Sequence, residues 1–242
     1  MKLRLDQELT RQGVVDTRSQ AESWVKLGKV TVDGKVITKP EFYVRAGADI
    51  KLTAPERYVS RAGLKLAGVA SKLGADFKGK VVLDVGSSTG GFTDYALKHG
   101  ASLVYAVDVG TNQLHASLRS DRRIKLHEKT DIRDFVPEKT PDIIVIDVSF
   151  ISLRQILPHI ASIAGANSRV YAMVKPQFEA TRQQLTSGGI VKNNSVRRAI
   201  LKDFENWSKG YFRIEAKADS DVKGANGNIE RFYCLAPLST KH

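Results

Sequence analysis

Short apolar runs alternate with helix-length segments from about residue 58 onward, and this alternation leaves few folds open to the chain. Runs such as Val81–Val85 and Ile143–Val148 are almost continuously apolar, which is typical of strands covered on both faces. Strands separated by helices predict a doubly wound, mostly parallel, Rossmann-like α/β sheet. We predict its strands at Val81–Val85, Leu103–Val109, Ile124–His127, Ile143–Val148, Arg169–Val174, Phe212–Ala218 and Arg231–Ala236.

The first 54 residues follow a different pattern, in which two amphipathic helices precede short strands. The helices are expected to end near Gly13 and Gly28, because glycine commonly follows the last turn of a helix. A hairpin is predicted about the Asp33-Gly34 turn. We therefore predict a small α+β domain over residues 1–54, a linker over 55–60 and the doubly wound domain over 61–242.

The most specific local signal is DVGSSTGGF at Asp84–Phe92, which joins the first strand of the doubly wound sheet to a helix. Small residues let the backbone approach a ligand closely, at the sheet edge where such folds bind ligands. Ser88 replaces the second glycine of the dinucleotide-binding fingerprint, and the loop has no P-loop lysine. Its acidic residue disfavours a pyrophosphate and suits a nucleoside with a cationic sulfonium, namely S-adenosylmethionine. The alternative is a tight turn without a ligand.

Two further carboxylates lie at the next two predicted strands: Asp108 at the end of Leu103–Val109, and Asp131 after Ile124–His127. Asp108 can accept hydrogen bonds from both hydroxyls of an adenosine ribose. Asp131 can reach an adenine amino group, although it can equally be a solvated turn residue. The predicted cofactor-binding residues are Asp84, Gly86, Ser87, Ser88, Thr89, Gly90, Gly91, Phe92, Asp108, Val109, Asp131, Ile132 and Asp147.

Four charged residues are candidates for catalysis. Lys65 lies in a helix that leads into the sheet, Asp147 and Lys175 lie at strand ends, and Glu230 precedes the last strand. Because the carboxyl ends of parallel strands converge on one edge, Asp147 and Lys175 should lie near the glycine loop. Glu230 precedes its strand, so it shares that edge only if the last strand runs antiparallel. Taken singly, each of these residues can instead form a surface salt bridge.

A sulfonium donor beside two lysines and two carboxylates suits methyl transfer to a hydroxyl, such as that of a ribose, and this transfer requires that the hydroxyl lose its proton. A neutral lysine can accept this proton, whereas a charged lysine can orient the hydroxyl and stabilise the developing alkoxide. Neighbouring cations favour the neutral amine and neighbouring carboxylates favour the ammonium, so the sequence leaves both roles open. We predict Lys175 as the proton acceptor, Asp147 as the group that orients Lys175 and the methyl donor, and Lys65 and Glu230 as groups that position the ribose.

The chain has 38 lysines and arginines against 26 acidic residues, a net charge of +12. This excess predicts a polyanionic partner, with a merely solubilising surface as the alternative. The single cysteine, Cys234, excludes an intrachain disulfide and the usual cysteine-based zinc sites, so we predict a buried thiol and no metal site. No apolar run approaches the roughly 18 residues of a membrane span, and no signal-peptide core is evident. We expect a cytoplasmic protein without a membrane partner.

Six motifs occur in a fixed order: SRAGLKL at Ser60–Leu66, the loop at Asp84–Phe92, AVDVG, IDVSF, MVKPQFE and GNIE. In combination they resemble TlyA-type proteins, which are FtsJ-like ribose methyltransferases, and the resemblance covers essentially the whole chain. It implies S-adenosylmethionine-dependent 2′-O-methylation of ribosomal RNA. The short ends resemble those of members that modify a large-subunit cytidine. The family's Lys-Asp-Lys-Glu tetrad falls on Lys65, Asp147, Lys175 and Glu230.

Residues 4–34 resemble the RNA-binding module of the fourth small-subunit ribosomal protein, which implies that basic side chains there contact RNA phosphates. Residues 1–60 carry 11 lysines and arginines against 8 acids, so both domains are expected to share the binding of ribosomal RNA or a ribosomal subunit. A solvated basic face is the alternative. The predicted RNA-binding residues are Arg4, Arg18, Lys26, Lys29, Lys35, Lys39, Arg61, Arg182, Lys192, Arg197 and Arg198.

Other functions account for only part of the sequence. A haemolysin, the family's historical label, requires a membrane-spanning or strongly amphipathic segment, and none is evident. A non-catalytic ribosome assembly factor does not need a complete tetrad and glycine loop. A small-molecule methyltransferase leaves the N-terminal module and the charge unexplained, and a pseudouridine synthase requires another catalytic domain.

Overall fold

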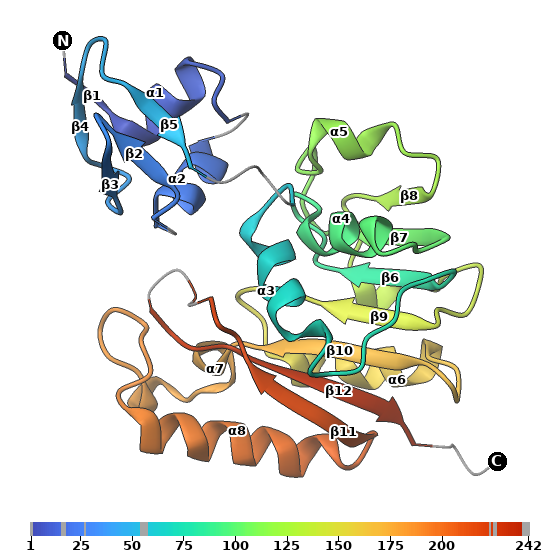
Figure 1. Ribbon diagram of the computed structural model, residues 1–242. Helices are drawn as coiled ribbons and strands as arrows, with labels where there is room; N and C mark the ends of the chain where they lie inside the picture. The colour runs from blue at the N-terminus through green and yellow to red at the C-terminus, as the bar shows by residue number, and fades with distance from the viewer. Residues whose placement is uncertain are drawn as a thin grey trace. The chain divides into compact units, whose positions relative to one another are not determined.

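The computed structural model describes residues 2–15, 18–26, 28–53, 58–222, 224 and 227–238. The chain divides into two compact units, Met1–Arg61 and Ala62–His242. Figure 1 shows the helices and strands of each unit.

The N-terminal unit packs two helices beside two small sheets, and Leu5, Leu9 and Trp24 are buried in its core. The predicted hairpin is present, with positive φ angles of 49° at Asp33 and 79° at Gly34. The strands Lys2–Arg4 and Tyr43–Arg45 were not predicted from the sequence. Each is as short as the hairpin strands, but they pair with each other far apart in the chain, so no tight turn marks them. The elements are β1 (Lys2–Arg4), α1 (Leu5–Arg11), α2 (Arg18–Lys26), β2 (Val30–Val32), β3 (Lys35–Ile37), β4 (Tyr43–Arg45) and β5 (Ile50–Leu52).

The second unit is built on a seven-stranded sheet with the order β11-β12-β10-β9-β6-β7-β8. Strand β12 runs antiparallel to both of its neighbours, and the other pairs are parallel. This confirms the predicted doubly wound α/β sheet. The strands are β6 (Val81–Val85), β7 (Leu103–Val107), β8 (Ile124–His127), β9 (Ile143–Ile146), β10 (Arg169–Val174), β11 (Phe212–Asp219) and β12 (Arg231–Pro237).

Helices cover both faces of this sheet. Adjacent residues of a strand point to opposite faces, and Phe232 and Tyr233 of β12 illustrate this. The ring of Phe232 lies 6.0 Å from Phe92 of the helix Gly91–Lys98, whereas Tyr233 lies 5.4 Å from Phe204 of the helix Asn194–Ser208. The helices are α3 (Arg61–Ala70), α4 (Gly91–Lys98), α5 (Ala116–Arg119), α6 (Leu157–Ile163), α7 (Pro176–Glu179) and α8 (Asn194–Ser208), with short 3-10 turns at η1 (Ile132–Asp134), η2 (Leu153–Gln155) and η3 (Arg182–Gln184). In the part of the chain that the structure describes, no helix has the length and hydrophobicity needed to cross a bilayer.

Two strands end earlier than predicted. Strand β7 stops at Val107 and β9 at Ile146, each two residues short of the predicted end, so Asp108 and Asp147 lie in the loops beyond the strands. Because β12 is antiparallel to β10, Glu230 lies at the same edge of the sheet as Lys175. The condition that the sequence set for Glu230 is therefore met.

Candidate active site

A pocket of about 490 Å³ opens where β6, β7 and β9 end. Its volume lies within the range of roughly 300–1,000 Å³ that small-molecule sites occupy. Seven of the predicted cofactor-binding residues line it: Gly86, Ser88, Asp108, Val109, Asp131, Ile132 and Asp147. Residues that sequence analysis did not single out also contribute, among them Gln113, Thr130, Val148, Ser149, Phe150, Ile151 and Ile156.

The glycine loop requires glycine at its first position because the backbone there meets another segment. Gly86 has a φ of 78°, and a Cβ atom on it would lie 2.8 Å from the carbonyl oxygen of Asp147. Such a distance is too short for a carbon atom, so a side chain at this position would push the loop away from Asp147. The loop and the segment after β9 thus form one continuous pocket wall.

Asp84 and some of its neighbours shape this loop from behind and do not line the pocket. Asp84 is 1% exposed and accepts a hydrogen bond of 2.6 Å from the Thr93 hydroxyl, which ties β6 to α4. Burial raises the pKa of Asp84 to about 7, although this hydrogen bond opposes the shift. Ser87 and Phe92 are buried as well. Thr89, Gly90 and Gly91 are also outside the pocket lining, so the prediction of direct ligand contact receives no support at these six positions.

Asp108 is held rigidly in the pocket wall. Its carboxylate accepts hydrogen bonds from the backbone N–H of Ser88 (2.8 Å) and of Gly110 (2.7 Å). Each carboxylate oxygen has a second acceptor site, so Asp108 can still accept hydrogen bonds from two hydroxyls of a ligand. This arrangement suits the predicted contact with a ribose.

Asp131 combines the two alternatives that the sequence left open. It caps η1 by accepting a hydrogen bond of 2.9 Å from the Arg133 backbone N–H, as a turn residue does, and it also lines the pocket. The Arg133 guanidinium also donates to it at 2.6 Å. These hydrogen bonds lower the pKa of Asp131 to about 2, so the carboxylate is an acceptor at neutral pH.

The four predicted catalytic residues form two ion pairs. Lys65 on α3 contacts Glu230, and both side chains are almost fully covered, with exposures of 10% and 4%. Lys175, directly after β10, lies with its Nζ atom 2.6 Å from the Asp147 carboxylate. Lys175 Nζ also donates a hydrogen bond of 2.7 Å to the Ser149 hydroxyl.

Strand register brings these two ion pairs to the same edge. The last paired residues of β10 and β12 are Val174 and Arg231, so Lys175 and Glu230 are the next residues on the two antiparallel strands. Asp147 belongs both to the second ion pair and to the pocket wall. Asp147 therefore borders the pocket and Lys175 is paired with it, which agrees with the strand-end argument for these two residues.

Phe150 is the most conspicuous feature that sequence analysis missed. It adopts a φ of 65°, which is rare for a side chain of its size, and it is 91% exposed. Its ring packs on Phe178 of α7 at 5.4 Å. The motif IDVSF was interpreted as strand up to Val148, and this hid the loop that places Ser149 and Phe150 beside the pocket.

Comparison with known proteins identifies the family of each part of the chain. Residues 58–236 match the family of FtsJ-like methyltransferases. The chain belongs to this family. Residues 3–50 match the S4 domain, so the two matches fall on different units of the structure.

Individual relatives of this FtsJ-like methyltransferase match over most of their length. The 16S/23S rRNA (cytidine-2′-O)-methyltransferase TlyA of Mycobacterium tuberculosis is 37% identical over 97% of this chain and 90% of the relative. The 23S rRNA (cytidine-2′-O)-methyltransferase TlyA of Campylobacter jejuni is 42% identical over 74% of this chain and 70% of the relative. A solved structure from Streptococcus thermophilus, described as a candidate hemolysin, is 39% identical with a TM-score of 0.78, covering 98% and 89% of the two chains.

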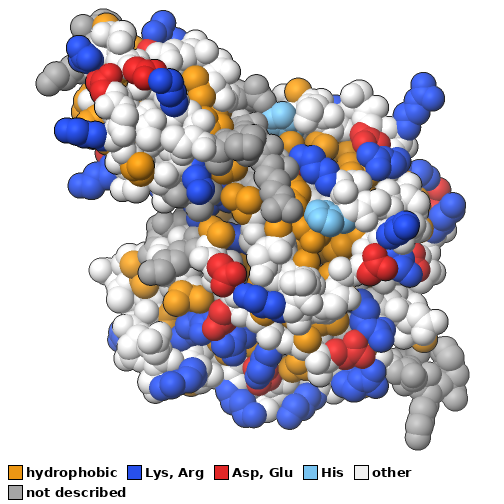
Figure 2. Space-filling model, in the orientation of Figure 1, with side chains coloured by type: hydrophobic (Ala, Val, Ile, Leu, Met, Phe, Trp, Pro, Cys, Tyr) orange, Lys and Arg blue, Asp and Glu red, His pale blue; other side chains and the backbone are white. Residues whose placement is uncertain are grey.

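The basic residues of this FtsJ-like methyltransferase differ in how accessible they are. Arg4 and Arg18 both pair with the buried Asp6, at 2.9 and 3.0 Å, and Lys26 lies 3.7 Å from Glu22. Arg61 is half-buried. Figure 2 shows lysine and arginine side chains spread over the displayed face of each unit. The predicted RNA-binding residues with exposed side chains and no ion pair within the described ranges are Lys29, Lys35, Lys39, Arg182, Lys192 and Arg198.

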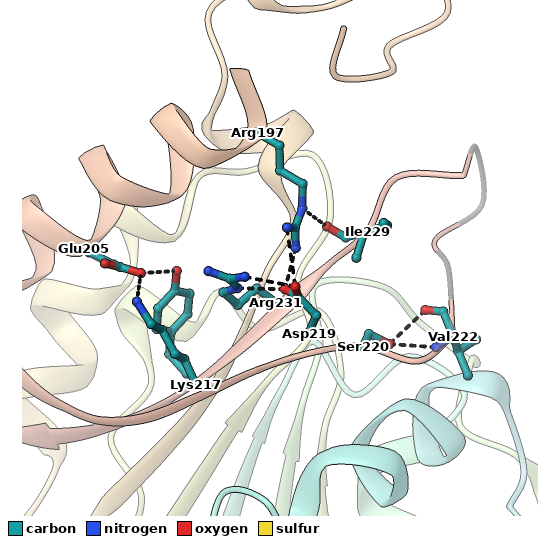
Figure 3. A network of polar contacts seen from close by, with 9 residues as sticks. Arg197, Glu205, Lys217, Asp219, Ser220, Val222, Ile229 and Arg231 are labelled. Atoms are coloured by element: carbon teal, nitrogen blue, oxygen red, sulfur yellow. Dashed lines mark hydrogen bonds and ion pairs between the residues drawn. The ribbon is translucent and has the colours of Figure 1, made fainter. Parts of the chain in front are cut away.

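Arg197 is engaged inside the FtsJ-like methyltransferase domain. Its side chain is only 12% exposed and forms an ion pair with Asp219, as Figure 3 shows. Its Nε also donates a hydrogen bond of 3.0 Å to the carbonyl oxygen of Ile229. Burial alone would raise the pKa of Asp219, but hydrogen bonds from Arg231 and Arg197 outweigh burial and lower it to about 2. The structure therefore gives no support to the prediction that Arg197 contacts RNA.

Proposed function

We propose that this protein transfers a methyl group from S-adenosylmethionine to the 2′-hydroxyl of a ribose in ribosomal RNA, with a large-subunit cytidine as the target. The observation that carries this proposal is the position of Asp147, which borders the pocket and pairs with Lys175. The names of the M. tuberculosis and C. jejuni relatives support the choice of reaction and substrate.

The pocket has the donors and acceptors that S-adenosylmethionine needs. Asp108 would accept hydrogen bonds from the ribose hydroxyls, and the apolar side chains of Val109 and Ile132 would lie against the adenine. Asp131, ionised at neutral pH, would accept a hydrogen bond from the adenine amino group. When bound, S-adenosylmethionine supplies a methyl group that is activated by attachment to a sulfonium.

Lys175 would take the proton of the ribose 2′-hydroxyl. The oxygen freed of its proton would accept the methyl group, which S-adenosylmethionine would supply with its thioether as the leaving group. Asp147 holds the amine in place at 2.6 Å. Glu230 lies next to Lys175 at the edge of the sheet and is paired with Lys65. These two residues would position the ribose.

The exposed ring of Phe150 offers a surface on which a base can stack. RNA is read largely through unpaired bases that stack on aromatic side chains. Phe150 lines the pocket and is 91% exposed, so a target nucleotide with its ribose at Lys175 can place its base against this ring.

RNA binding would be divided between the two units. We propose that residues 1–54 form the RNA-binding domain, 55–60 the linker and 61–242 the methyltransferase domain. The S4 match supports the first assignment, as do the exposed Lys35 on the β2–β3 hairpin and Lys29 and Lys39 beside it. Such an enzyme would work in the cytoplasm, where its ribosomal substrate is found.

Methyl transfer in vitro tests the proposal. Purified protein is incubated with ribosomal subunits that lack the modification and with radiolabelled S-adenosylmethionine, and the RNA is then hydrolysed in alkali. A 2′-O-methylated nucleotide resists alkaline cleavage because its 2′-oxygen cannot attack the phosphate, so label in an alkali-resistant dinucleotide is expected. Label on a base, or no label in either subunit, would contradict the proposed reaction.

A further inference from the structure

Two side chains have no part in the reaction described above: Ser149, which lines the pocket, and Glu179, which is buried. Ser149 accepts a hydrogen bond of 2.7 Å from Lys175 Nζ. Glu179, whose side chain is 1% exposed, accepts hydrogen bonds from the Ser152 hydroxyl at 2.6 Å and from the Leu153 backbone N–H at 2.7 Å. Both groups connect the segment after β9 with the segment after β10.

We propose that Ser149 is a positioning residue for the Lys175 amine, and that Glu179 holds the backbone that carries Ser149. The proposal rests on the proposed function, since it concerns the proton transfer at Lys175.

The geometry at Lys175 Nζ supports this role. A neutral amine carries two N–H bonds and one lone pair, arranged tetrahedrally about nitrogen with the side-chain carbon. The Ser149 hydroxyl accepts one N–H bond of Lys175 at 2.7 Å, and the Asp147 carboxylate lies 2.6 Å from the same nitrogen as its ion-pair partner. These two contacts restrict rotation of the amine, so that its lone pair keeps one direction. Without the Ser149 hydroxyl, the amine can rotate about its Cε–Nζ bond and the lone pair loses its direction.

The backbone that carries Ser149 needs a restraint from outside. Phe150, the next residue, has a φ of 65°, in the left-handed region that residues other than glycine rarely adopt. Strained backbone persists where surrounding contacts enforce it. Glu179 provides such contacts at residues 152 and 153, and Phe178 adds a ring contact to Phe150. The short helix α7 thereby links the position of Lys175 to that of Ser149.

Ser149 also lines the pocket, so the competing explanation is a direct contact with the cofactor. The two roles predict different kinetic effects. Loss of a positioning group lowers kcat and leaves the dissociation constant of the cofactor unchanged. Loss of a cofactor contact raises that dissociation constant.

The test uses the full chain with Ser149→Ala, Ser149→Thr and, as a matched control, Ser162→Ala, which removes an exposed hydroxyl from α6. We measure kcat and KM on ribosomal subunits, together with the dissociation constant of S-adenosylmethionine. Ser149→Ala should lower kcat about 10- to 100-fold, the loss expected when a reacting group is misdirected. Its cofactor affinity should stay within about two-fold, Ser149→Thr should recover most of the lost rate, and Ser162→Ala should match the unchanged protein.

Glu179→Gln provides a second measurement. Because Glu179 acts through the position of Ser149, its effect on kcat should be much smaller in the Ser149→Ala background than in the unchanged protein. Fully additive losses would overturn the link between Glu179 and Ser149. A kcat within two-fold of normal for Ser149→Ala, or a loss explained by weaker cofactor binding, would overturn the positioning role while leaving the proposed function intact. Failure of the unchanged protein to methylate either subunit would overturn the proposed function and this inference with it.

Discussion

The carboxyl edge of the central sheet and the β2–β3 hairpin of the N-terminal unit use positive charge in opposite ways. At the edge, Lys65 and Lys175 are about 10% exposed, and each has a carboxylate partner. On the hairpin and beside it, Lys29, Lys35 and Lys39 are exposed to solvent. A covered and paired lysine has a fixed direction and can act at one atom, whereas an exposed lysine attracts a polyanion without fixed geometry. We therefore expect the net charge of +12 to favour binding of a polyanion such as RNA, and the two paired lysines to act in the reaction.

The largest effect is expected at the edge. Lys175→Ala removes the proposed proton acceptor and should lower kcat about 10²- to 10⁴-fold, which is the usual contribution of general-base catalysis. The dissociation constant of S-adenosylmethionine, measured by calorimetry, should stay within a few-fold because Lys175 is not part of the pocket lining. Near-normal turnover on ribosomal subunits would remove Lys175 from the mechanism.

The buried carboxyl group of Asp84 differs from the carboxylates at the sheet edge, because it accepts a hydrogen bond from the Thr93 hydroxyl and not from a lysine. Because its pKa is raised to about 7, the folded protein retains a proton that the unfolded chain loses near pH 4. The stability that this proton contributes is complete below pH 4 and is lost as the pH rises through 7. Asp84→Asn should therefore gain stability relative to the unchanged protein between pH 4 and 8, by up to about 4 kcal/mol. Urea unfolding at several pH values measures this difference, and a pH-independent difference would rule out the raised pKa.

The contribution of the hairpin lysines to RNA affinity should depend on salt concentration, whereas that of the paired lysines at the sheet edge should not. Replacing Lys29, Lys35 and Lys39 together by Gln should weaken RNA binding about 10- to 100-fold at low salt and reduce the slope of log affinity against log salt by about 2 to 3. Cofactor affinity should not change. An unaltered slope in filter-binding titrations would show that these lysines do not contact phosphates.

The smallest effects are expected at two neighbouring arginines of α8, one paired and one exposed, which form a closely matched comparison. Arg197 is paired with Asp219, whereas Arg198 is exposed. Arg197→Gln should lower the free energy of unfolding by about 1–3 kcal/mol, because charged hydrogen bonds are lost, and Arg198→Gln should change it by less than about 0.5 kcal/mol. RNA affinity should fall only for Arg198→Gln. The reverse pattern would return Arg197 to the RNA-binding surface.

Much of this architecture could be predicted because it follows from local patterns. Continuous apolar runs identified the buried parallel strands, and the small residues at Asp84–Phe92 identified the loop beside the pocket. From the sequence, Glu230 could share an edge with Lys175 only if the last strand ran antiparallel, and the structure meets this condition.

The remaining features depend on contacts between residues that are distant in sequence. Arg197 resembled other basic residues until its partner Asp219, 22 residues away, was located. The left-handed backbone at Phe150 has no glycine to mark it and is restrained by α7, so neither Phe150 nor Ser149 was identified. Asp84 was predicted to bind the ligand because it stands next to the glycine loop in the sequence. Its burial behind that loop depends on the packing of α4, which the sequence does not show.

Mapping ribose methylation by mass spectrometry tests the central claim most directly. Ribosomal RNA is compared from cells that carry the unchanged gene, that lack it, or that carry Lys175→Ala in its place. A 2′-O-methylcytidine present only with the unchanged gene is the predicted result. Identical methylation in all three cell lines, or a mark that persists with Lys175→Ala, would contradict the assignment of this reaction to the Lys175–Asp147 edge.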